Sequence, residues 1–271
     1  MSRRFFAAAV QLLAGPDKEE NFARTTALVR EAAERGAALV VLPEMFFWRG
    51  PRAAEPEAAE PIPGPTTERL AELARTFGIV LVGGSLLERL AGSAKAYNTS
   101  TVHDADGALL ATYRKVHLFD VEIHGHVDYR ESDTRLRGDR PVIARTALGT
   151  IGLSVCYDLR FPELYRALLA SGADIVCVPS AFTFPTGAHH WEILLRARAI
   201  ENQVYVVAPN QIGRGPSGIH DYGHSLIVDP WGTPIARASN RESVILGEID
   251  FDYLARVRRE LPCLEHRTLR S

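Results

Sequence analysis

The chemistry that this sequence could perform begins at Cys156, which directly follows the apolar stretch at residues 149–155. A polar turn comes next, and Pro162 suits the first turn of a helix. A thiol at such a strand-to-helix corner lies near unpaired backbone N–H groups, which favour the thiolate and can hold an oxyanion. Cys156 is therefore a candidate nucleophile. The alternative is a small apolar residue that closes a buried strand.

Two charged residues also stand where apolar runs end. Glu44 follows residues 37–42, and Lys115 follows residues 109–113. If the three strands share a sheet and run the same way, Glu44, Lys115 and Cys156 converge at one edge. There the thiol would attack a carbonyl or nitrile carbon, Glu44 would carry its proton to the leaving nitrogen, and Lys115 would stabilise the oxyanion. A surface salt bridge or solvated loop ends are the alternative for Glu44 and Lys115.

The elements that must position these residues alternate between strands and helices, which predicts an α/β fold. We find no internal repeat and no linker typical of a domain boundary, so we expect one domain over residues 1–271 with a polar C-terminal tail. The expected strands cover residues 5–13, 37–42, 78–84, 96–103, 109–113, 141–146, 149–155, 173–179, 204–208, 223–229 and 243–249. The expected helices cover residues 21–35, 66–76, 162–170, 191–200 and 250–260.

Long connections separate some of these elements. Residues 46–65 are rich in Pro, Ala and Glu, include Trp48 and Arg49, and are expected to be a loop that shapes a pocket mouth. Residues 116–138 are polar and hold several histidines and carboxylates. Since charged loops of this length inside a domain are more often functional than idle, we expect this segment to border the site. Residues 180–189 form a third expected loop.

The composition of the chain limits the classes of molecule that we expect it to bind. The chain has 271 residues, 46% of them hydrophobic and 24% charged, with a formal net charge of -2. This balance gives no sign of a nucleic-acid surface or of a polybasic membrane surface. We therefore expect small molecules or other copies of the chain as partners.

Cysteine usage and the N-terminus bear on the compartment. Cys156, Cys177 and Cys263 are an odd number without C-x-x-C spacing, which argues against a disulfide framework and predicts a reducing, cytoplasmic setting. Cys177 lies in an apolar run and is expected in the core. The start, MSRRFFAAAVQLLAG, has two arginines before an apolar stretch, but it contains Gln11 and runs into an acidic helix start. We interpret it as the first strand, and we expect no transmembrane segment.

Three motifs carry a family resemblance. LPEMF around Glu44, YRKVHLFD around Lys115 and GLSVCYDLRFPEL around Cys156 resemble those of the nitrilase, or carbon–nitrogen hydrolase, superfamily. The resemblance covers nearly the whole chain, through SAFTFPTGAHHWE, LLRARAIENQVYVVAPNQIGR and YGHSLIVDPWGTPIA, and is closest to the branch of deaminated glutathione amidase and omega-amidase. It implies a four-layer α-β-β-α sandwich whose monomers pair through the helices beside the cysteine corner, giving a homodimer or a higher homo-oligomer.

The same resemblance implies roles for the catalytic residues. Glu44 would be the general base, Lys115 would stabilise the oxyanion, and Cys156 would become an acyl-thioester. The backbone N–H of Tyr157 would be a second oxyanion donor, and Glu131 would position Lys115 and the substrate amide. Water activated by Glu44 would then release the acid.

Other positions are expected to bind substrate. Arg160, four residues after the cysteine, matches an arginine that binds a substrate carboxylate in relatives, and its planar fork suits a carboxylate. A structural ion pair with Asp158 or Glu163 is the alternative. By resemblance His117 stands beside the pocket, and Phe182 and Thr183 of the 180–189 loop are expected to contact the substrate.

The predicted function is a cysteine-dependent amidase that cleaves a small carboxylated amide to acid and ammonia without a cofactor or metal. An N-carbamoyl amino acid or a nitrile is the alternative substrate within the family, and a non-catalytic binding module is the alternative outside it. His124 replaces a proline that relatives tend to have, and His189 stands beside His190, so both are expected to bear on specificity. A zinc site at His124, His126, His189 and His190 is a further alternative, but the chain lacks the H-E-x-x-H motif.

Overall fold

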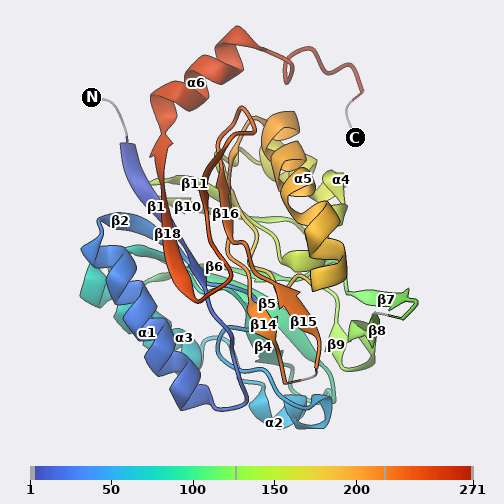
Figure 1. Cartoon of the computed structure of the whole chain (residues 1–271). Coiled ribbons are helices and arrows are strands. Elements are labelled where there is room, and N and C mark those ends of the chain that lie inside the picture. Colours follow the sequence, from blue (N-terminus) through green and yellow to red (C-terminus); the bar gives the residue numbers. More distant parts are fainter. Residues whose placement is uncertain (1–3, 126, 217, 270–271) are drawn as a thin grey trace.

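The chain folds into four layers, with helices outside and two β-sheets inside (Figure 1). The computed structural model describes residues 4–125, 127–216 and 218–269. Helices α1 (Lys18–Glu34) and α3 (Pro65–Phe77) cover one sheet, and α4 (Pro162–Ala170) and α5 (Phe184–Asn202) cover the other. This arrangement confirms the α-β-β-α sandwich expected from the sequence.

The first sheet carries the strand that leads to Glu44 and the one that leads to Lys115. Its order is β18-β1-β2-β3-β5-β4, and β6 and β9 also pair with β5. Strand β2 is parallel to β3, β3 is antiparallel to β5, and β5 is antiparallel to β6, so β2 and β6 run the same way. The strands are β1 (Arg4–Gln11), β2 (Ala37–Val41), β3 (Val80–Val82), β4 (Leu86–Arg89), β5 (Ala96–His103), β6 (Leu109–Arg114), β9 (Arg135–Leu136) and β18 (Ser243–Asp250).

The second sheet carries the strand that leads to Cys156. Its order is β10-β11-β12-β13-β16-β17, with β11, β12 and β13 parallel to one another. The strands are β10 (Val142–Thr146), β11 (Gly149–Leu153), β12 (Ile175–Cys177), β13 (Tyr205–Ala208), β16 (Leu226–Val228) and β17 (Pro234–Arg237).

The core follows from the alternation of side chains along the buried strands. In β1, Ala7 and Ala9 pack between the two sheets, whereas Ala8 and Val10 pack toward α1 and α3. Because successive side chains of a strand point to opposite faces, a strand that is apolar throughout is buried on both faces. Cys177 is buried between the sheets and the helices, in the core position predicted for it.

Local signals set the helix ends. Asp17 caps α1 by accepting hydrogen bonds from the backbone N–H groups of Glu19 and Glu20 at 2.9 and 3.0 Å, so the helix begins before the expected residue 21. Gly78 ends α3 in the left-handed conformation. Helix α5 begins at Phe184 with Pro185 in its first turn, so most of the expected loop at residues 180–189 is helical.

The two other expected loops also contain regular structure. Residues 46–65 include a 3₁₀ turn (Arg52–Ala54) and α2 (Glu55–Ala58). Residues 116–138 include the hairpin of β7 (Asp120–Ile123) and β8 (Val127–Arg130), a 3₁₀ turn (Glu131–Asp133) and β9. These elements have two to four residues each, which is too short for a periodic pattern of apolar residues to reveal them in the sequence. Strands β4 and β17 and the hairpin of β14 (Ile212–Arg214) and β15 (His220–Tyr222) were also not predicted from the sequence.

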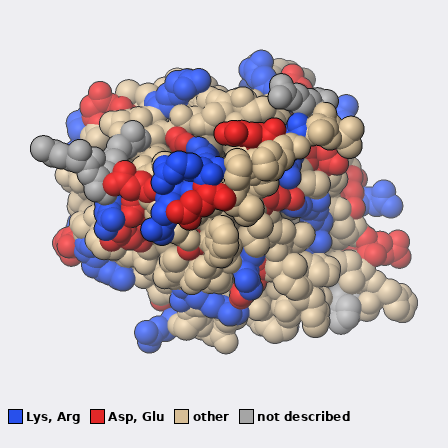
Figure 2. All heavy atoms as spheres, turned by 90° about the horizontal axis from the view of Figure 1, so that it is seen from above, with Lys and Arg blue, Asp and Glu red and all other residues tan. Residues whose placement is uncertain are grey.

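Helix α6 (Phe251–Glu260) is the last helix of the described chain and lies at the end of the molecule opposite α2 (Figure 1). Seen from that end, basic and acidic side chains are interspersed (Figure 2). This mixture agrees with the near-neutral net charge of -2. None of the helices in the described part of the chain combines the length and apolar character needed to cross a membrane.

Candidate active site

Glu44 follows β2 and its carboxylate is held from three directions. Oε1 accepts hydrogen bonds from Asn98 Nδ2 at 2.8 Å and Lys115 Nζ at 3.0 Å, and Oε2 accepts one from Ala181 N at 2.8 Å. The turn after it is tight, because Met45 has a φ of 53°. The buried carboxylate therefore has one orientation, and its donors come from both halves of the chain.

Lys115 follows β6 and is buried between two carboxylates. Its Nζ lies 3.0 Å from Glu44 Oε1 and 2.8 Å from Glu131 Oε2. Burial alone would lower the pKa of Lys115, but the charges of Glu131 and Glu44 outweigh it and hold the pKa well above its usual value. Lys115 is therefore a fixed positive charge.

Glu131 begins the 3₁₀ turn after β8 and connects Lys115 to a second cation. It accepts hydrogen bonds from Phe119 N at 2.7 Å and from Arg135 Nη1 at 2.7 Å, and Arg135 in turn donates to Glu55 Oε1 at 2.8 Å. Burial would raise the pKa of Glu131, but the charges of Lys115 and Arg135 outweigh it and lower the pKa to about 2. Arg135, Glu55 and Asn98 were not predicted from the sequence, because the contacts Arg135–Glu55 and Asn98–Glu44 join residues that are distant in the chain.

Cys156 occupies a strained corner at the start of a 3₁₀ turn (Cys156–Arg160). Its φ is 48°, a conformation that L-residues with side chains rarely adopt, and its N–H donates to Pro179 O at 2.9 Å. Burial and the charge of Glu44 raise the pKa of the Cys156 thiol well above its usual value, although Lys115 acts in the opposite direction. Burial and Glu44 therefore outweigh the groups around the corner that favour the thiolate. A neutral thiol beside an anchored carboxylate suits proton transfer to that carboxylate.

The three side chains meet in a different way from the one considered in the sequence analysis. Glu44 and Lys115 leave parallel strands of the first sheet, but Cys156 leaves β11 of the second sheet. The three strands therefore do not share one sheet, which is the arrangement considered from the sequence. The residues converge because the two stacked sheets deliver them to the same end of the sandwich.

Asp158 ties the cysteine turn to the segment around Lys115. Its carboxylate accepts hydrogen bonds from Tyr113 Oη at 2.7 Å, Val155 N at 2.8 Å and His117 N at 3.0 Å. His117 Nδ1 also lies 2.7 Å from Asp158 Oδ1, and its ring stacks on Phe161 with centroids 3.7 Å apart. His117 therefore lies behind the cysteine turn and outside the described lining of the pocket, unlike the expected position beside it.

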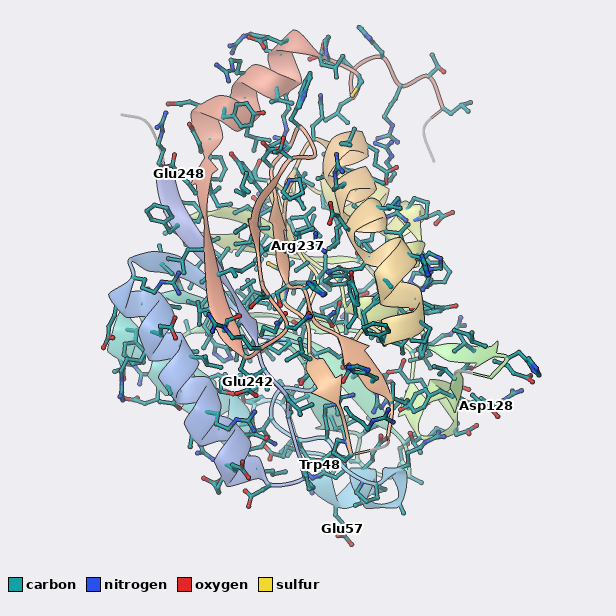
Figure 3. The ribbon with its side chains drawn as sticks, in the orientation of Figure 1. Trp48, Glu57, Asp128, Arg237, Glu242 and Glu248 are labelled. Atoms are coloured by element: carbon teal, nitrogen blue, oxygen red, sulfur yellow. The ribbon has the colours of Figure 1, made fainter. Side chains whose placement is uncertain are left out.

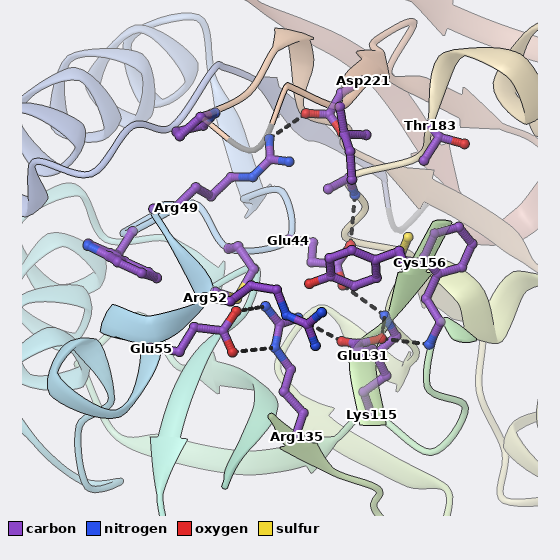
Figure 4. A pocket seen from close by; sticks show the side chains of 18 residues that line it. Glu44, Arg49, Arg52, Glu55, Lys115, Glu131, Arg135, Cys156, Thr183 and Asp221 are labelled. Carbon is purple, nitrogen blue, oxygen red and sulfur yellow. Dashed lines mark hydrogen bonds and ion pairs between the residues drawn. The ribbon is translucent and has the colours of Figure 1, made fainter. Parts of the chain in front are cut away.

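A cavity of about 100 Å³ opens in front of these groups, which is room for a small molecule (Figure 4). We call it the Arg49 arm. Its lining includes Glu44, Lys115, Glu131 and Cys156, and further out Trp48, Arg49, Arg52, Tyr129 and Asp221. A second, smaller hollow, the Arg160 arm, is lined by Tyr157, Arg160, Phe182 and Thr186. Phe119, Cys156, Ala181 and Thr183 border both arms, so the thiol stands where the two arms meet.

The predicted substrate-binding residues after the cysteine gather in the Arg160 arm. The Arg160 guanidinium carbon lies 5.2 Å from the centre of the Phe182 ring and 5.7 Å from that of Tyr157, and Nη1 lies 3.2 Å from His190 Nδ1. Within the described residues Arg160 forms no ion pair with Asp158 or Glu163, so the structural alternative is not observed. Thr183 precedes α5 and borders both arms.

At the outer end of the Arg49 arm, Arg49 pairs with Asp221 through Nη1 and Oδ2. Arg49 comes from the segment after β2, and Figure 3 shows its neighbour Trp48 near α2 and the β14–β15 hairpin. Asp221 comes from β15. Arg49 was expected near a pocket mouth, but Asp221 was not predicted, because no pattern in the sequence links the two.

The histidines considered for zinc are dispersed. His124 lies in the exposed turn between β7 and β8, and His189 is exposed on α5. His126 lies outside the described residues. Across residues 4–125, 127–216 and 218–269, no three His, Cys, Asp or Glu side chains group in a way that could hold a metal ion.

Comparisons with known proteins agree with this geometry. The profile of the family described as carbon-nitrogen hydrolase matches residues 6–259. The human deaminated glutathione amidase is 46% identical over 96% of this chain and 81% of its own length, and the Xenopus tropicalis omega-amidase NIT2 is 42% identical over 97% and 95%.

Solved structures show the same likeness. The C. elegans NitFhit protein has a TM-score of 0.92 and 40% identity, covering 98% of this chain and 66% of that one. A variant amidase from Nesterenkonia sp. AN1, solved with acrylamide added at its active-site cysteine, has a TM-score of 0.79 and 29% identity, covering 95% of this chain and 98% of that one.

Proposed function

The chain belongs to the carbon–nitrogen hydrolase family, and from that premise we propose that Cys156 attacks the amide carbon of a small, carboxylate-bearing substrate. The observation that carries the proposal is the buried cluster of Cys156, Glu44 and Lys115 at the meeting point of two pocket arms. The cluster holds an acid–base group and a fixed cation beside one neutral thiol. The reaction is cysteine-dependent hydrolysis of a C–N bond other than a peptide bond.

In the first half of the reaction, Glu44 takes the thiol proton as sulfur attacks the carbonyl carbon. Lys115 Nζ and the backbone N–H of Tyr157 stabilise the oxyanion. Glu44 then gives its proton to the leaving nitrogen, the C–N bond breaks, and an acyl-thioester remains on Cys156. The fixed position of Glu44 lets one carboxylate serve both proton transfers.

In the second half, Glu44 takes a proton from water, which attacks the thioester and releases the acid. The proton returns to the thiol and restores the resting site. Glu131 is proposed as the positioning residue for Lys115 and for the substrate amide, since it contacts Lys115 Nζ at 2.8 Å and lines the pocket.

Arg160 is proposed to bind the substrate carboxylate, with Phe182 and Thr183 along the acyl chain. Its support is a guanidinium that pairs with His190 and with no carboxylate among the described residues, in an arm that begins at Cys156. Relatives named omega-amidase and deaminated glutathione amidase suggest an acyl group of the dicarboxylic type.

A substrate panel tests the assignment. Purified protein is offered glutaramate, a neutral amide of equal length, an N-carbamoyl amino acid and a nitrile, and ammonia release is followed. We expect glutaramate to be hydrolysed fastest, and we expect a thiol alkylator to stop turnover where a chelator does not. Loss of activity with the chelator alone would contradict the cysteine mechanism, and no turnover of any substrate would favour a binding module.

A homodimer in the cytoplasm is the proposed setting, with the whole chain as one domain. Helix α5 leaves Ile193 exposed at 68% on its outer side, and Trp231 is exposed at 57% in the turn that packs on Ile200. Such large apolar side chains support pairing through this face. The three cysteines are all free, which agrees with a reducing compartment. Light scattering of wild-type protein and of Ile193→Glu tests the pairing, which this substitution should weaken.

A further inference from the structure

Asn98 of β5 is a buried residue whose side chain contacts both glutamates of the site. It is 0% exposed, and its Nδ2 donates to Glu44 Oε1 at 2.8 Å and to Glu131 Oε1 at 3.2 Å. Because both partners are carboxylates, the amide nitrogen must face them, and Oδ1 points elsewhere. Oδ1 is buried and has no hydrogen-bond partner among the described residues. A buried carbonyl without a partner lowers stability, so a purely stabilising role does not account for Asn98.

The donors around Glu131 fill its carboxylate completely. A carboxylate offers about four acceptor positions, two on each oxygen. Oε1 accepts hydrogen bonds from Arg135 Nη1 at 2.7 Å and from Asn98. Oε2 accepts them from Lys115 Nζ at 2.8 Å and from Phe119 N at 2.7 Å. A proton could bind to Glu131 only by displacing one of these donors.

The same count at Glu44 leaves one acceptor position. Oε1 accepts from Asn98 and from Lys115 Nζ at 3.0 Å, and Oε2 accepts from Ala181 N at 2.8 Å. Burial raises the pKa of the Cys156 thiol most, and hydrogen bonds with Glu44 and with Ala181 N also act on it, so the sulfur lies beside these two groups. Since Ala181 N is the donor to Oε2, the remaining position of Glu44 lies on Oε2 and faces the sulfur.

The backbone and the side chain of Asn98 act on the site separately. Its backbone oxygen accepts a hydrogen bond from Lys115 N at 2.8 Å, and a substitution keeps this contact. Loss of the side-chain amide, by contrast, opens one acceptor position on Glu44 Oε1 and one on Glu131 Oε1. A transferred proton could then bind at either of these positions as well as at Glu44 Oε2, and only Oε2 faces the sulfur.

We propose that Asn98 is a positioning residue for proton transfer, which directs the transferred proton to Oε2 of Glu44 by donating to both glutamates. The inference rests on the proposed function. The thiol proton moves to Oε2 as the S–C bond forms, and it moves from Oε2 to the leaving nitrogen as the C–N bond breaks. The proton taken from water occupies Oε2 in the second half of the reaction and then returns to the thiol. Glu131 and Lys115 keep their charges throughout.

Kinetics of Asn98→Leu test this role, because leucine is similar in size and has no donor. We expect kcat for glutaramate to fall about 10²-fold, with KM changed by about threefold at most. The acid limb of the pH profile of kcat/KM should move up by about one pH unit, because a carboxylate that loses a donor takes up a proton more readily. A side chain that only supports the fold would not move this limb.

Ser100→Ala is the matched control. Ser100 lies two positions further along β5 and therefore on the same face, it is buried, and its Oγ has no hydrogen-bond partner among the described residues. We expect this variant to keep kcat within about twofold of the wild type and to keep the pH profile unchanged. Asn98→Ser is the second variant if Asn98→Leu does not fold. A hydroxyl donates to one carboxylate at most, so its kcat and its acid limb should lie between those of the wild type and the full effect.

Alkylation by iodoacetamide, followed at Cys156 by mass spectrometry over a pH series, reports the first proton transfer without hydrolysis of an amide. We expect its acid limb to move up in the Asn98 variants by the same amount as that of kcat/KM. Unchanged acid limbs in both measurements, with hydrolysis of glutaramate intact, would overturn this inference alone. A shifted alkylation limb in a protein that hydrolyses no amide would support the role of Asn98 and overturn the proposed function.

Discussion

The two ends of the Arg49 arm hold charged groups in different ways. Around Lys115 each charge has several partners, since Lys115 contacts two carboxylates and Glu131 accepts from Lys115, Arg135 and Phe119. The Arg49–Asp221 pair has one contact and unused atoms. A network whose charges are all paired several times fixes one geometry, whereas a pair with a single contact fixes less. The reacting groups therefore lie at the end of the arm where the geometry is most constrained.

Removal of the reacting sulfur of Cys156, beside the Lys115 network, should have the largest effect on activity. We expect Cys156→Ala to reduce kcat by about 10⁴-fold or more, since no other thiol lies in the pocket lining. The folded state should persist, because a small buried side chain is replaced by a smaller one. Steady-state kinetics with circular dichroism as the folding control checks both. Near-normal rates would contradict the whole assignment.

Removal of one charge from the network should be the next largest effect. We expect Glu131→Gln to lower kcat by about 10²-fold with a smaller change in KM, because Lys115 loses the partner that positions it. Glu131→Asp keeps the charge and should recover part of the activity. A change in KM alone would place Glu131 in substrate binding.

Glu131→Gln should also change how the free energy of unfolding depends on pH. The pKa of Glu131 is lowered from 4.5 to about 2 in the folded protein, so its contribution is present above 4.5 and is lost as the pH falls toward 2. We expect the free energy of unfolding of the wild type to decline across this window and that of Glu131→Gln to decline less steeply. Urea denaturation at several pH values measures both slopes, and equal slopes would contradict the ionised state of Glu131.

A substitution in the Arg160 arm should have an intermediate effect and tests whether binding groups act separately from the network. We expect Arg160→Lys to raise KM about tenfold for glutaramate, because lysine lacks the planar fork that binds a carboxylate through two bonds. KM for a neutral amide of equal length should stay unchanged, and kcat should change little. Equal effects on both amides would give Arg160 a structural role.

The sequence predicts the reacting residues of the site better than the residues that hold them in place. Glu44, Lys115 and Cys156 could be found because each follows an apolar run, and the family resemblance added Glu131. Arg135 and Glu55 could not be found, since their contact joins residues 80 positions apart and neither belongs to a periodic pattern. Asp221 was missed for the same reason, because its partner is 172 positions away.

The buried strands of the α/β fold were predictable because strands buried on both faces are apolar throughout, as in β2, whereas the four-layer arrangement was expected only from the family resemblance. The hairpin of β7 and β8 was not predictable, because each strand has only four residues, so the alternation of polar and apolar side chains is too short to stand out from the polar segment around it. The helical start of α5 was missed since residues 184–190 mix polar and small side chains. In each case long-range contacts, rather than local preference, decide the structure.

The smallest effect is expected outside both arms, at His189. His189 was expected from the sequence to bear on specificity, but it is exposed on α5 and lies outside the described lining of either arm. We expect His189→Ala to change kcat/KM less than about twofold for glutaramate and for a neutral amide of equal length, because exposed side chains without contacts contribute little. His190→Ala is the comparison variant. His190 Nδ1 lies 3.2 Å from Arg160 Nη1, so removal of the His190 ring should change KM for glutaramate. A larger effect at His189 than at His190 would mean that the substrate reaches beyond the two arms, and the division of the pocket would have to be redrawn.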